Sequence, residues 1–67
     1  MIRIRLNGED RSVDADLTIA SLLGSLGIPG MRLAVERNRR IVPREGYDSE
    51  PVEAGDRIEI VTLVGGG

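Results

Sequence analysis

Hydrophobic and polar residues alternate strictly at the start of the chain. In MIRIRL (1–6), the aliphatic side chains fall on one face of an extended strand and the arginines fall on the other face. A period of two is typical of a strand with one buried side. Asn7 and Gly8 follow, and this pair favours a tight hairpin because both residues accept positive φ. RSVDA (11–15) is the predicted return strand.

The period lengthens in DLTIASLLGSLGI (16–28), which predicts an amphipathic helix. Its hydrophobic stripe at i, i+3, i+4 and i+7 consists of Ile19, Leu22, Leu23 and Leu26. Thr18 or Asp16 can cap the start by accepting a hydrogen bond from an unpaired N–H, and Gly27 favours the left-handed turn that ends a helix. Gly24, inside the helix, indicates either a close approach by a strand or a tolerated defect.

Three more extended segments follow the helix. RLAVE (32–36) and RIEIVTLV (57–64) alternate with period two, so each predicts a strand with one buried face. IVP (41–43) is a short strand that we expect at an edge of the sheet or ending at Pro43, because proline cannot donate a ladder hydrogen bond. The residues between them, 44–56, are rich in turn formers and acids and predict a loop-rich crossing.

The order strand, strand, helix, strand, short strand, strand predicts an α+β fold of the β-grasp (ubiquitin-like) type. We expect a mixed sheet of four to five strands with one main helix packed on one face. The crossover after the first hairpin lets the final strand lie parallel beside the first strand, in the centre of the sheet. We predict a β-grasp domain over 1–64 and a flexible Gly-Gly-Gly tail over 65–67.

The composition limits the possible chemistry of the protein more than it limits the possible fold. The chain has 67 residues, nine arginines against 11 acidic residues, a net charge of -2, and neither Cys nor His. One domain is all this length allows, and the charge balance argues against nucleic-acid binding because no strong positive field is present. The missing residue types exclude disulfides, thiol nucleophiles, the commonest general base and the commonest metal ligands. We therefore expect no bound cofactor, no metal site and no enzyme acting alone.

Two clusters of charge have simple interpretations. RNRR (37–40) is the cationic cluster of the chain, and we interpret it as a solvated turn or, alternatively, as a docking patch for an acidic partner. Asp48, Glu50 and Glu53 lack the spacing of a calcium loop and are predicted to be solvated acids.

The start of the chain does not resemble a signal peptide and no segment has the length of a membrane span, so we expect a cytoplasmic protein.

With these segments in view, the sequence resembles the thiamine-biosynthesis sulfur carrier (ThiS) family over its whole length. The matching segments are LTIASLL (17–23), LAVERNRRIVPRE (33–45) and VEAGDRIEIVTLVGGG (52–67). A terminal Gly-Gly alone is weak evidence, but its spacing from IVPRE and EAGDRIEI makes the resemblance specific. The chain departs from the family in carrying a third glycine, Gly65, and a more basic segment at 37–40.

The resemblance implies a function for the glycine tail, Gly65, Gly66 and Gly67. The α-carboxylate of Gly67 is the expected covalent modification site. A ThiF-like, E1-type enzyme would adenylate it with ATP and Mg²⁺, and a cysteine desulfurase or other sulfur donor would convert it to a thiocarboxylate. A ThiG-like thiazole synthase would then receive the sulfur. Glycine suits such a tail because a chain without Cβ atoms passes through a narrow entrance and takes any φ.

Strand parity also predicts a docking face. Ala34, Val61 and Leu63 should point away from the helix and form a modest apolar patch near the start of the tail, for which incidental exposure is the alternative. Arg3 and Arg5 share that face and could steer an acidic partner.

Other functions stay open at this point. The same carrier chemistry could serve molybdopterin or cysteine synthesis, and the tail could be conjugated to lysines of other proteins. From a different class, the domain could be a ubiquitin-like binding module that never carries a group covalently.

Overall fold

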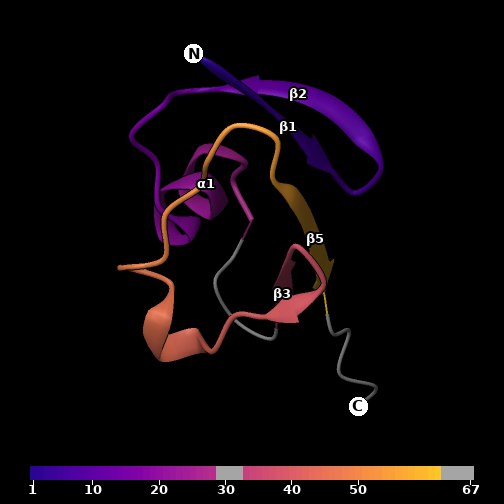
Figure 1. The fold of residues 1–67 in the computed structure, drawn as a ribbon. Helices are drawn as coiled ribbons and strands as arrows, with labels where there is room; N and C mark the ends of the chain where they lie inside the picture. Colours follow the sequence, from indigo (N-terminus) through magenta and orange to yellow (C-terminus); the bar gives the residue numbers. More distant parts are fainter. Residues whose placement is uncertain (29–32, 63–67) are drawn as a thin grey trace.

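The computed structural model describes residues 1–28 and 33–62, which form one sheet and one main helix (Figure 1). The elements in chain order are β1 (Ile2–Leu6), β2 (Glu9–Val13), α1 (Ile19–Ser25), β3 (Leu33–Arg37), β4 (Arg40–Ile41), the 3₁₀ helix η1 (Arg44–Gly46) and β5 (Arg57–Thr62). The sheet has five strands in the order β2-β1-β5-β3-β4, and α1 lies on one face of it. The predicted α+β, β-grasp architecture is confirmed.

The final strand occupies the centre of the sheet. β5 pairs in parallel with β1, with Arg5 opposite Arg57 and Leu6 opposite Ile58, and it pairs antiparallel with β3. Parallel neighbours require a crossover connection, and here α1 and the segments around it provide that connection. The two remaining pairs, β1 with β2 and β3 with β4, are antiparallel.

The first hairpin turns on two residues with positive φ, Asn7 at 50° and Gly8 at 83°. Such a two-residue turn matches the right-handed twist of the flanking strands. Pairing therefore resumes at once, with Leu6 opposite Glu9, so β2 begins at Glu9 and ends at Val13. The predicted strand at 11–15 was too late by two residues for this reason.

Helix α1 begins at a side-chain cap. The backbone N–H of Ser21 donates to Oγ1 of Thr18 at 3.2 Å, and Thr18 itself has extended φ and ψ. This arrangement satisfies one of the free N–H groups of the first turn. The sequence allowed Thr18 or Asp16 as the cap, and the structure identifies Thr18.

The helix ends in a Schellman motif. Gly27 has a φ of 69°, its N–H donates to the carbonyl of Gly24, and the N–H of Ile28 donates to the carbonyl of Leu23. These two bonds satisfy carbonyls that the end of a helix leaves free. The terminating role predicted for Gly27 is confirmed. A Cβ added at Gly24 would meet nothing within 4 Å, so no strand approaches closely there.

One aliphatic core lies between the sheet and α1. The buried hydrophobic residues are Ile4, Leu6, Val13, Ile19, Leu22, Leu23, Leu33, Val35, Val42, Tyr47, Val52, Ile58 and Ile60. The inward positions expected from strand parity are all in this set, apart from the half-buried Ile2.

The segment 44–56, which was predicted to be a loop-rich crossing, also contributes to the core. It contains η1, and its residues Tyr47 and Val52 are buried. β4 lies at the sheet edge and ends before Pro43, as expected.

The two glycines of α1 should respond oppositely to the same substitution. Gly24→Ala should raise the free energy of unfolding by about 1 kcal/mol, because Ala favours the helix and has open space there. Gly27→Ala should lower it by about 1 kcal/mol, because Ala is strained at positive φ. Urea unfolding of both variants measures this difference, and a destabilised Gly24→Ala would show that the helix packs more tightly there than described.

Candidate functional site

The outer face of the sheet is the face that α1 leaves uncovered (Figure 1). Ala34 of β3 and Val61 of β5 are Cα partners and both are exposed, with Val61 54% accessible. Their position away from the helix agrees with the alternation of the two strands. Their role in binding a partner stays a prediction.

Arg3 and Arg5 lie on the same outer face, on β1, and both are exposed. Nη2 of Arg3 lies 3.8 Å from a carboxylate oxygen of Asp10, and Nη2 of Arg5 donates to the carbonyl of Gly8 at 3.5 Å. Long, exposed contacts of this kind contribute little to stability. Arg57 is opposite Arg5 in the register, so three guanidinium groups belong to this region.

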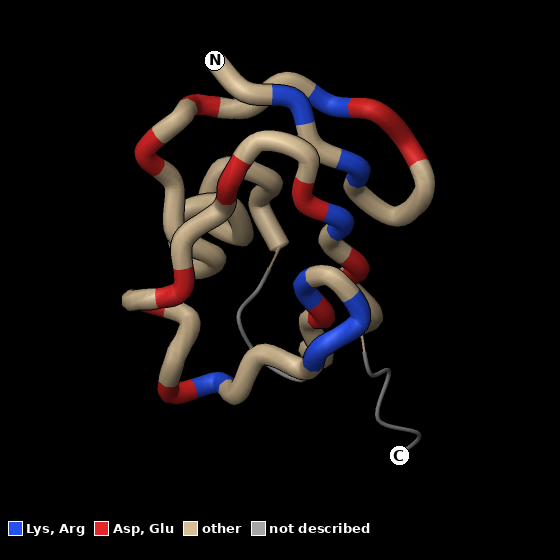
Figure 2. Tube along the Cα trace, in the orientation of Figure 1, with Lys and Arg blue, Asp and Glu red and all other residues tan. Residues whose placement is uncertain are grey.

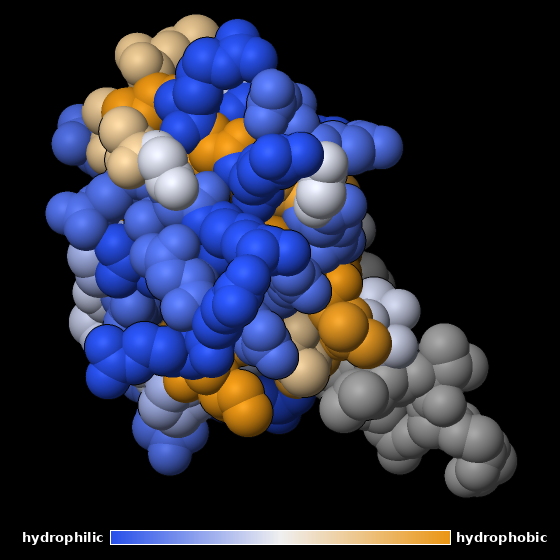
Figure 3. Space-filling model, turned by 45° about the vertical axis from the view of Figure 1, so that its right-hand side comes forward, coloured by the Kyte–Doolittle hydropathy of each residue, from blue (hydrophilic) through white to orange (hydrophobic). Residues whose placement is uncertain are grey.

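A further hydrophobic residue of this face was not among the predicted docking residues. Ile41 of β4 is 76% exposed and is the Cα partner of Glu36, which lies two positions from Ala34 on β3. We call Ala34, Ile41 and Val61 the outer apolar patch. Figure 3 shows small hydrophobic areas separated by hydrophilic side chains in a view that brings this side of the molecule forward. Alternation along the strand could have predicted this exposure. Neighbouring residues of a strand point to opposite faces, and Val42, next to Ile41, is buried.

Charges separate the patch from the arginines of β1. Glu36 and Glu59 are cross-strand partners on β3 and β5, and a carboxylate oxygen of Glu59 lies 3.4 Å from Nε of Arg57. The tube in Figure 2 shows basic and acidic positions interleaved along the strands, with a basic stretch at the turn between β3 and β4. The outer face therefore presents apolar, acidic and basic positions in succession.

Some predicted site residues cannot be placed. Leu63 and the glycines Gly65, Gly66 and Gly67 lie outside the described residues. The structure reaches Thr62, the last residue of β5, and Val61 lies beside it.

Arg37 is the centre of an ion-pair cluster that joins β3 to the segment before β5. Its side chain is 17% exposed, and its guanidinium nitrogens lie 2.6 Å from Asp56, 2.7 Å from Glu53 and 2.9 Å from Glu50. The prediction of a solvated turn at 37–40 is therefore wrong for Arg37, although residues 38–40 are exposed. The prediction of solvated acids is wrong for Glu50, which is 34% exposed and pairs with Arg37, but it is confirmed for Asp48, which is exposed, and for Glu53, which is 68% exposed although it also pairs with Arg37.

Asp56 is the buried acid of this cluster. Burial raises the pKa of its carboxyl, but hydrogen bonds from Arg37, from the N–H of Glu53 and from Asn38 together outweigh burial and hold that pKa below its ordinary value of 3.8. Hydrogen bonds to Asp56 and Glu50, opposed by burial, raise the pKa of Arg37 above its ordinary value. Both groups are therefore charged at neutral pH, and the charge of each group is balanced by the charge of the other.

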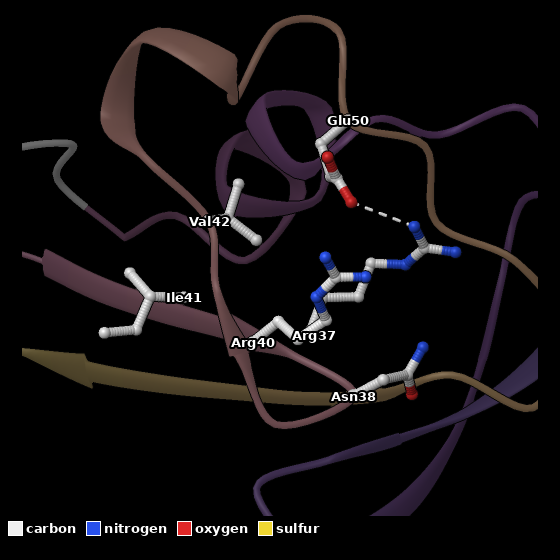
Figure 4. A pocket seen from close by; sticks show the side chains of 6 residues that line it. All are labelled: Arg37, Asn38, Arg40, Ile41, Val42 and Glu50. Carbon is white, nitrogen blue, oxygen red and sulfur yellow. Dashed lines mark hydrogen bonds and ion pairs between the residues drawn. The ribbon is translucent and has the colours of Figure 1, made fainter.

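A pocket of about 310 Å³ opens beside this cluster (Figure 4). Its lining residues are Arg37, Asn38, Arg40, Ile41, Val42 and Glu50. Figure 4 shows the guanidinium of Arg37 directed toward Glu50, with a dashed line for their contact. Because Arg37 is already held by three carboxylates, the pocket is better described as the open side of a structural cluster than as an anion site.

Among residues 1–28 and 33–62, no group of three or more acids is placed to hold a metal ion. In the same part of the chain, no helix has the length and apolar character needed to cross a membrane.

The five-stranded sheet, the single packed helix and the exposed face beside the end of β5 define a ubiquitin-like β-grasp domain. The model of the ThiS family matches residues 4–67. Sulfur carrier protein ThiS of Bacillus subtilis (strain 168) is 40% identical over 65 residues, which cover 96% of this chain and 98% of that protein. The chain therefore belongs to the ThiS family.

Two other comparisons support and extend this assignment. A thiamine biosynthesis protein (ThiS) from Geobacter metallireducens has a crystal structure similar to this one, with a TM-score of 0.85, 30% identity, and coverage of 98% of this chain and 100% of that chain. A thiazole synthase from Paramagnetospirillum magneticum is 44% identical over 66 residues, or 98% of this chain. This chain spans only 20% of the length of that relative.

The charge on Asp56 should make stability depend on pH. Its folded pKa is lowered, so its contribution is complete above the unfolded pKa near 3.8 and is lost as the pH falls through the folded pKa. Asp56→Asn should lower the free energy of unfolding by about 2 kcal/mol at neutral pH, because charged hydrogen bonds are lost. The difference between wild type and variant should shrink well below the ordinary pKa of Asp.

Urea unfolding of both proteins at neutral and at strongly acidic pH measures this difference. Asp10→Asn is the matched control, because Asp10 is exposed and makes one long ion pair with Arg3. Equal behaviour of Asp56→Asn and Asp10→Asn at neutral pH would contradict the role given to the cluster.

Proposed function

We propose that this chain carries sulfur as a thiocarboxylate on Gly67 and delivers it to the enzyme that forms the thiazole ring of thiamine. The observation that carries the proposal is that the family match extends through the three glycines to residue 67. The proposal requires a free α-carboxylate at Gly67, because a peptide bond there leaves no acid to activate.

The chemistry needs three steps, and partner proteins would carry out all of them. The Gly67 carboxylate attacks the α-phosphate of ATP, with Mg²⁺ on the phosphates, and pyrophosphate leaves. The terminal sulfur of a persulfide then attacks the acyl carbon and displaces AMP, which gives an acyl disulfide. A thiol cleaves the sulfur–sulfur bond, is itself oxidised to a disulfide, and leaves the thiocarboxylate on Gly67.

This role makes the chain a co-substrate of its partners and not an enzyme. It has no Cys and no His, so it lacks the usual activated nucleophile and the usual general base. The expected partners are a ThiF-like adenylating enzyme, a cysteine desulfurase or other sulfur donor, and a ThiG-like thiazole synthase. A relative that bears the name thiazole synthase supports the last of these. Dependence on ATP supports a cytoplasmic location.

The outer apolar patch, Ala34, Ile41 and Val61, is proposed as the surface that docks on the adenylating enzyme. These side chains are exposed on the uncovered face of the sheet. Exposed apolar side chains beside a functional segment are candidate binding anchors. Arg3, Arg5 and Arg57 lie on the same face and would increase the rate of association with an acidic surface.

The mass of the 67-residue chain tests the modification directly. Incubation with ATP, Mg²⁺, a ThiF-like enzyme and a persulfide donor should exchange one oxygen for sulfur at Gly67 and should do nothing without ATP. Fragmentation must locate the change, because oxidation of Met1 or Met31 adds nearly the same mass. A chain lacking Gly67 and Gly66 is the control and should remain unmodified.

An unmodified Gly67, with an enzyme that modifies another carrier in the same assay, would contradict the proposal for this pathway. It would favour a carrier for another pathway or a non-covalent binding module. Modification of Gly67, followed by transfer of its sulfur in the thiazole synthase reaction, would establish the thiazole ring as the destination of the sulfur.

Docking through the patch predicts a selective kinetic effect at Val61. Val61→Asp should raise the KM for this chain in ATP-dependent pyrophosphate release by about tenfold or more, because a charge replaces a buried contact in the complex. Val61→Thr keeps the shape and the strand preference and should change KM far less. An unchanged KM for Val61→Asp would place the docking surface elsewhere.

A further inference from the structure

A side-chain amide continues the central parallel ladder beyond the point where β1 ends. β1 ends at Leu6, and Asn7 turns the chain away into the hairpin with a φ of 50°. The N–H of Ile60 nevertheless donates to Oδ1 of Asn7 at 2.8 Å, and Nδ2 of Asn7 donates to the carbonyl of Ile60 at 3.3 Å. Both backbone groups of Ile60 that face β1 are therefore bound by one side chain.

This pair of bonds reproduces what a longer β1 would provide. The backbone N–H of Arg5 donates to Asp56 and that of Asn7 donates to Ile58, which is the regular spacing of a parallel ladder. The next bonds of that ladder would engage the N–H and the carbonyl of Ile60. The amide of Asn7 supplies both the acceptor and the donor after the backbone has turned away.

The hairpin itself does not require this amide. A type I′ turn needs residues that accept positive φ, and Gly satisfies that need as well as Asn does. The contact with Ile60 is therefore a separate property of Asn7, and it joins residues 53 positions apart.

The contact between Asn7 and Ile60 lies near the end of β5, and this place makes it important for the strand. Beyond Ile60, the described residues of β5 are Val61 and Thr62, whose register partners Ala34 and Leu33 are on β3. On the β1 side, the amide of Asn7 provides the last hydrogen bonds to β5 among the described residues. It therefore holds β5 from the second side two residues before the strand ends at Thr62.

We propose that Asn7 is a positioning residue, which fixes the direction of the last residues of β5 and thereby presents the C-terminal segment to the adenylating enzyme. This inference depends on the proposed function. Asn7 does not touch the reacting carboxylate, and its effect passes through Ile60. A misdirected end of β5 lowers the fraction of bound chains whose carboxylate is aligned with ATP.

Asn7→Gly separates the two properties of Asn7, because it keeps the turn and removes the amide. Hydrogen exchange at the N–H of Ile60 should become about tenfold faster in this variant, while the N–H of Ile58 keeps its protection. The kcat for pyrophosphate release should fall by about tenfold or more, with KM changed little because the outer apolar patch is intact. Asn7→Asp keeps the acceptor for the Ile60 N–H and should fall between Asn7→Gly and wild type in both measurements.

Gly27→Ala is the matched control for a simple loss of stability. It should destabilise the domain from the end of α1 without touching β5, so it should leave both kcat and the relative protection of Ile60 unchanged. An unchanged kcat in Asn7→Gly, with active wild type, would overturn the positioning role. Unchanged exchange at Ile60 would show that the amide does not anchor β5 and would also overturn it.

A different result separates this inference from the function on which it depends. Wild-type chain that supports no pyrophosphate release, with an adenylating enzyme active on another carrier, would overturn the proposed function and the presentation role together. A fall in kcat equal to that of Gly27→Ala would attribute the effect to stability and would overturn the positioning role alone.

Discussion

The pairing of β5 on both of its sides is the constraint on which the rest of the structure depends. β5 is the last strand of the chain but lies between β1 and β3, and its inward side chains, Ile58 and Ile60, are buried in the core. A strand in the centre of a sheet cannot move without breaking two ladders. The residues after Thr62 therefore follow a strand that is hydrogen-bonded on both sides as far as Ile60.

Asparagines in left-handed turns secure both ends of β5. At its start, the N–H of Arg57 donates to Oδ1 of Asn38, whose φ is 53°, and at its end the N–H of Ile60 donates to Oδ1 of Asn7. Asn suits this double task because it tolerates positive φ and its amide imitates a peptide group. The Arg37–Asp56 pair reinforces the start of β5 only, so the end of the strand depends on Asn7 and β3.

Local patterns predicted the elements, whereas contacts between distant segments could not be predicted in the same way. Alternation identified the inward faces of the strands, and the 3.6-residue stripe and Gly27 identified α1. The Arg37 cluster was missed because it joins a strand end to acids 13 to 19 positions away, and only the register brings them together. Asn7 was interpreted as a turn residue alone for the same reason. The exposure of Val61 was predictable from parity, while Gly67 was identified by resemblance to a family.

The small size of the outer apolar patch agrees with the work of a carrier. Ala34, Ile41 and Val61 are flanked by charged residues, including the cross-strand pair Glu36 and Glu59. A large apolar surface would bind tightly and would also favour aggregation, whereas a carrier must leave its activating enzyme before it meets the acceptor of its sulfur. In the proposed function, modest docking affinity at the sheet would allow the carrier to be recognised and then released. Under this proposal, the sheet face would determine how long the carrier stays on the enzyme, and the hydrogen bonds between Asn7 and Ile60 would determine how often a bound carrier reacts.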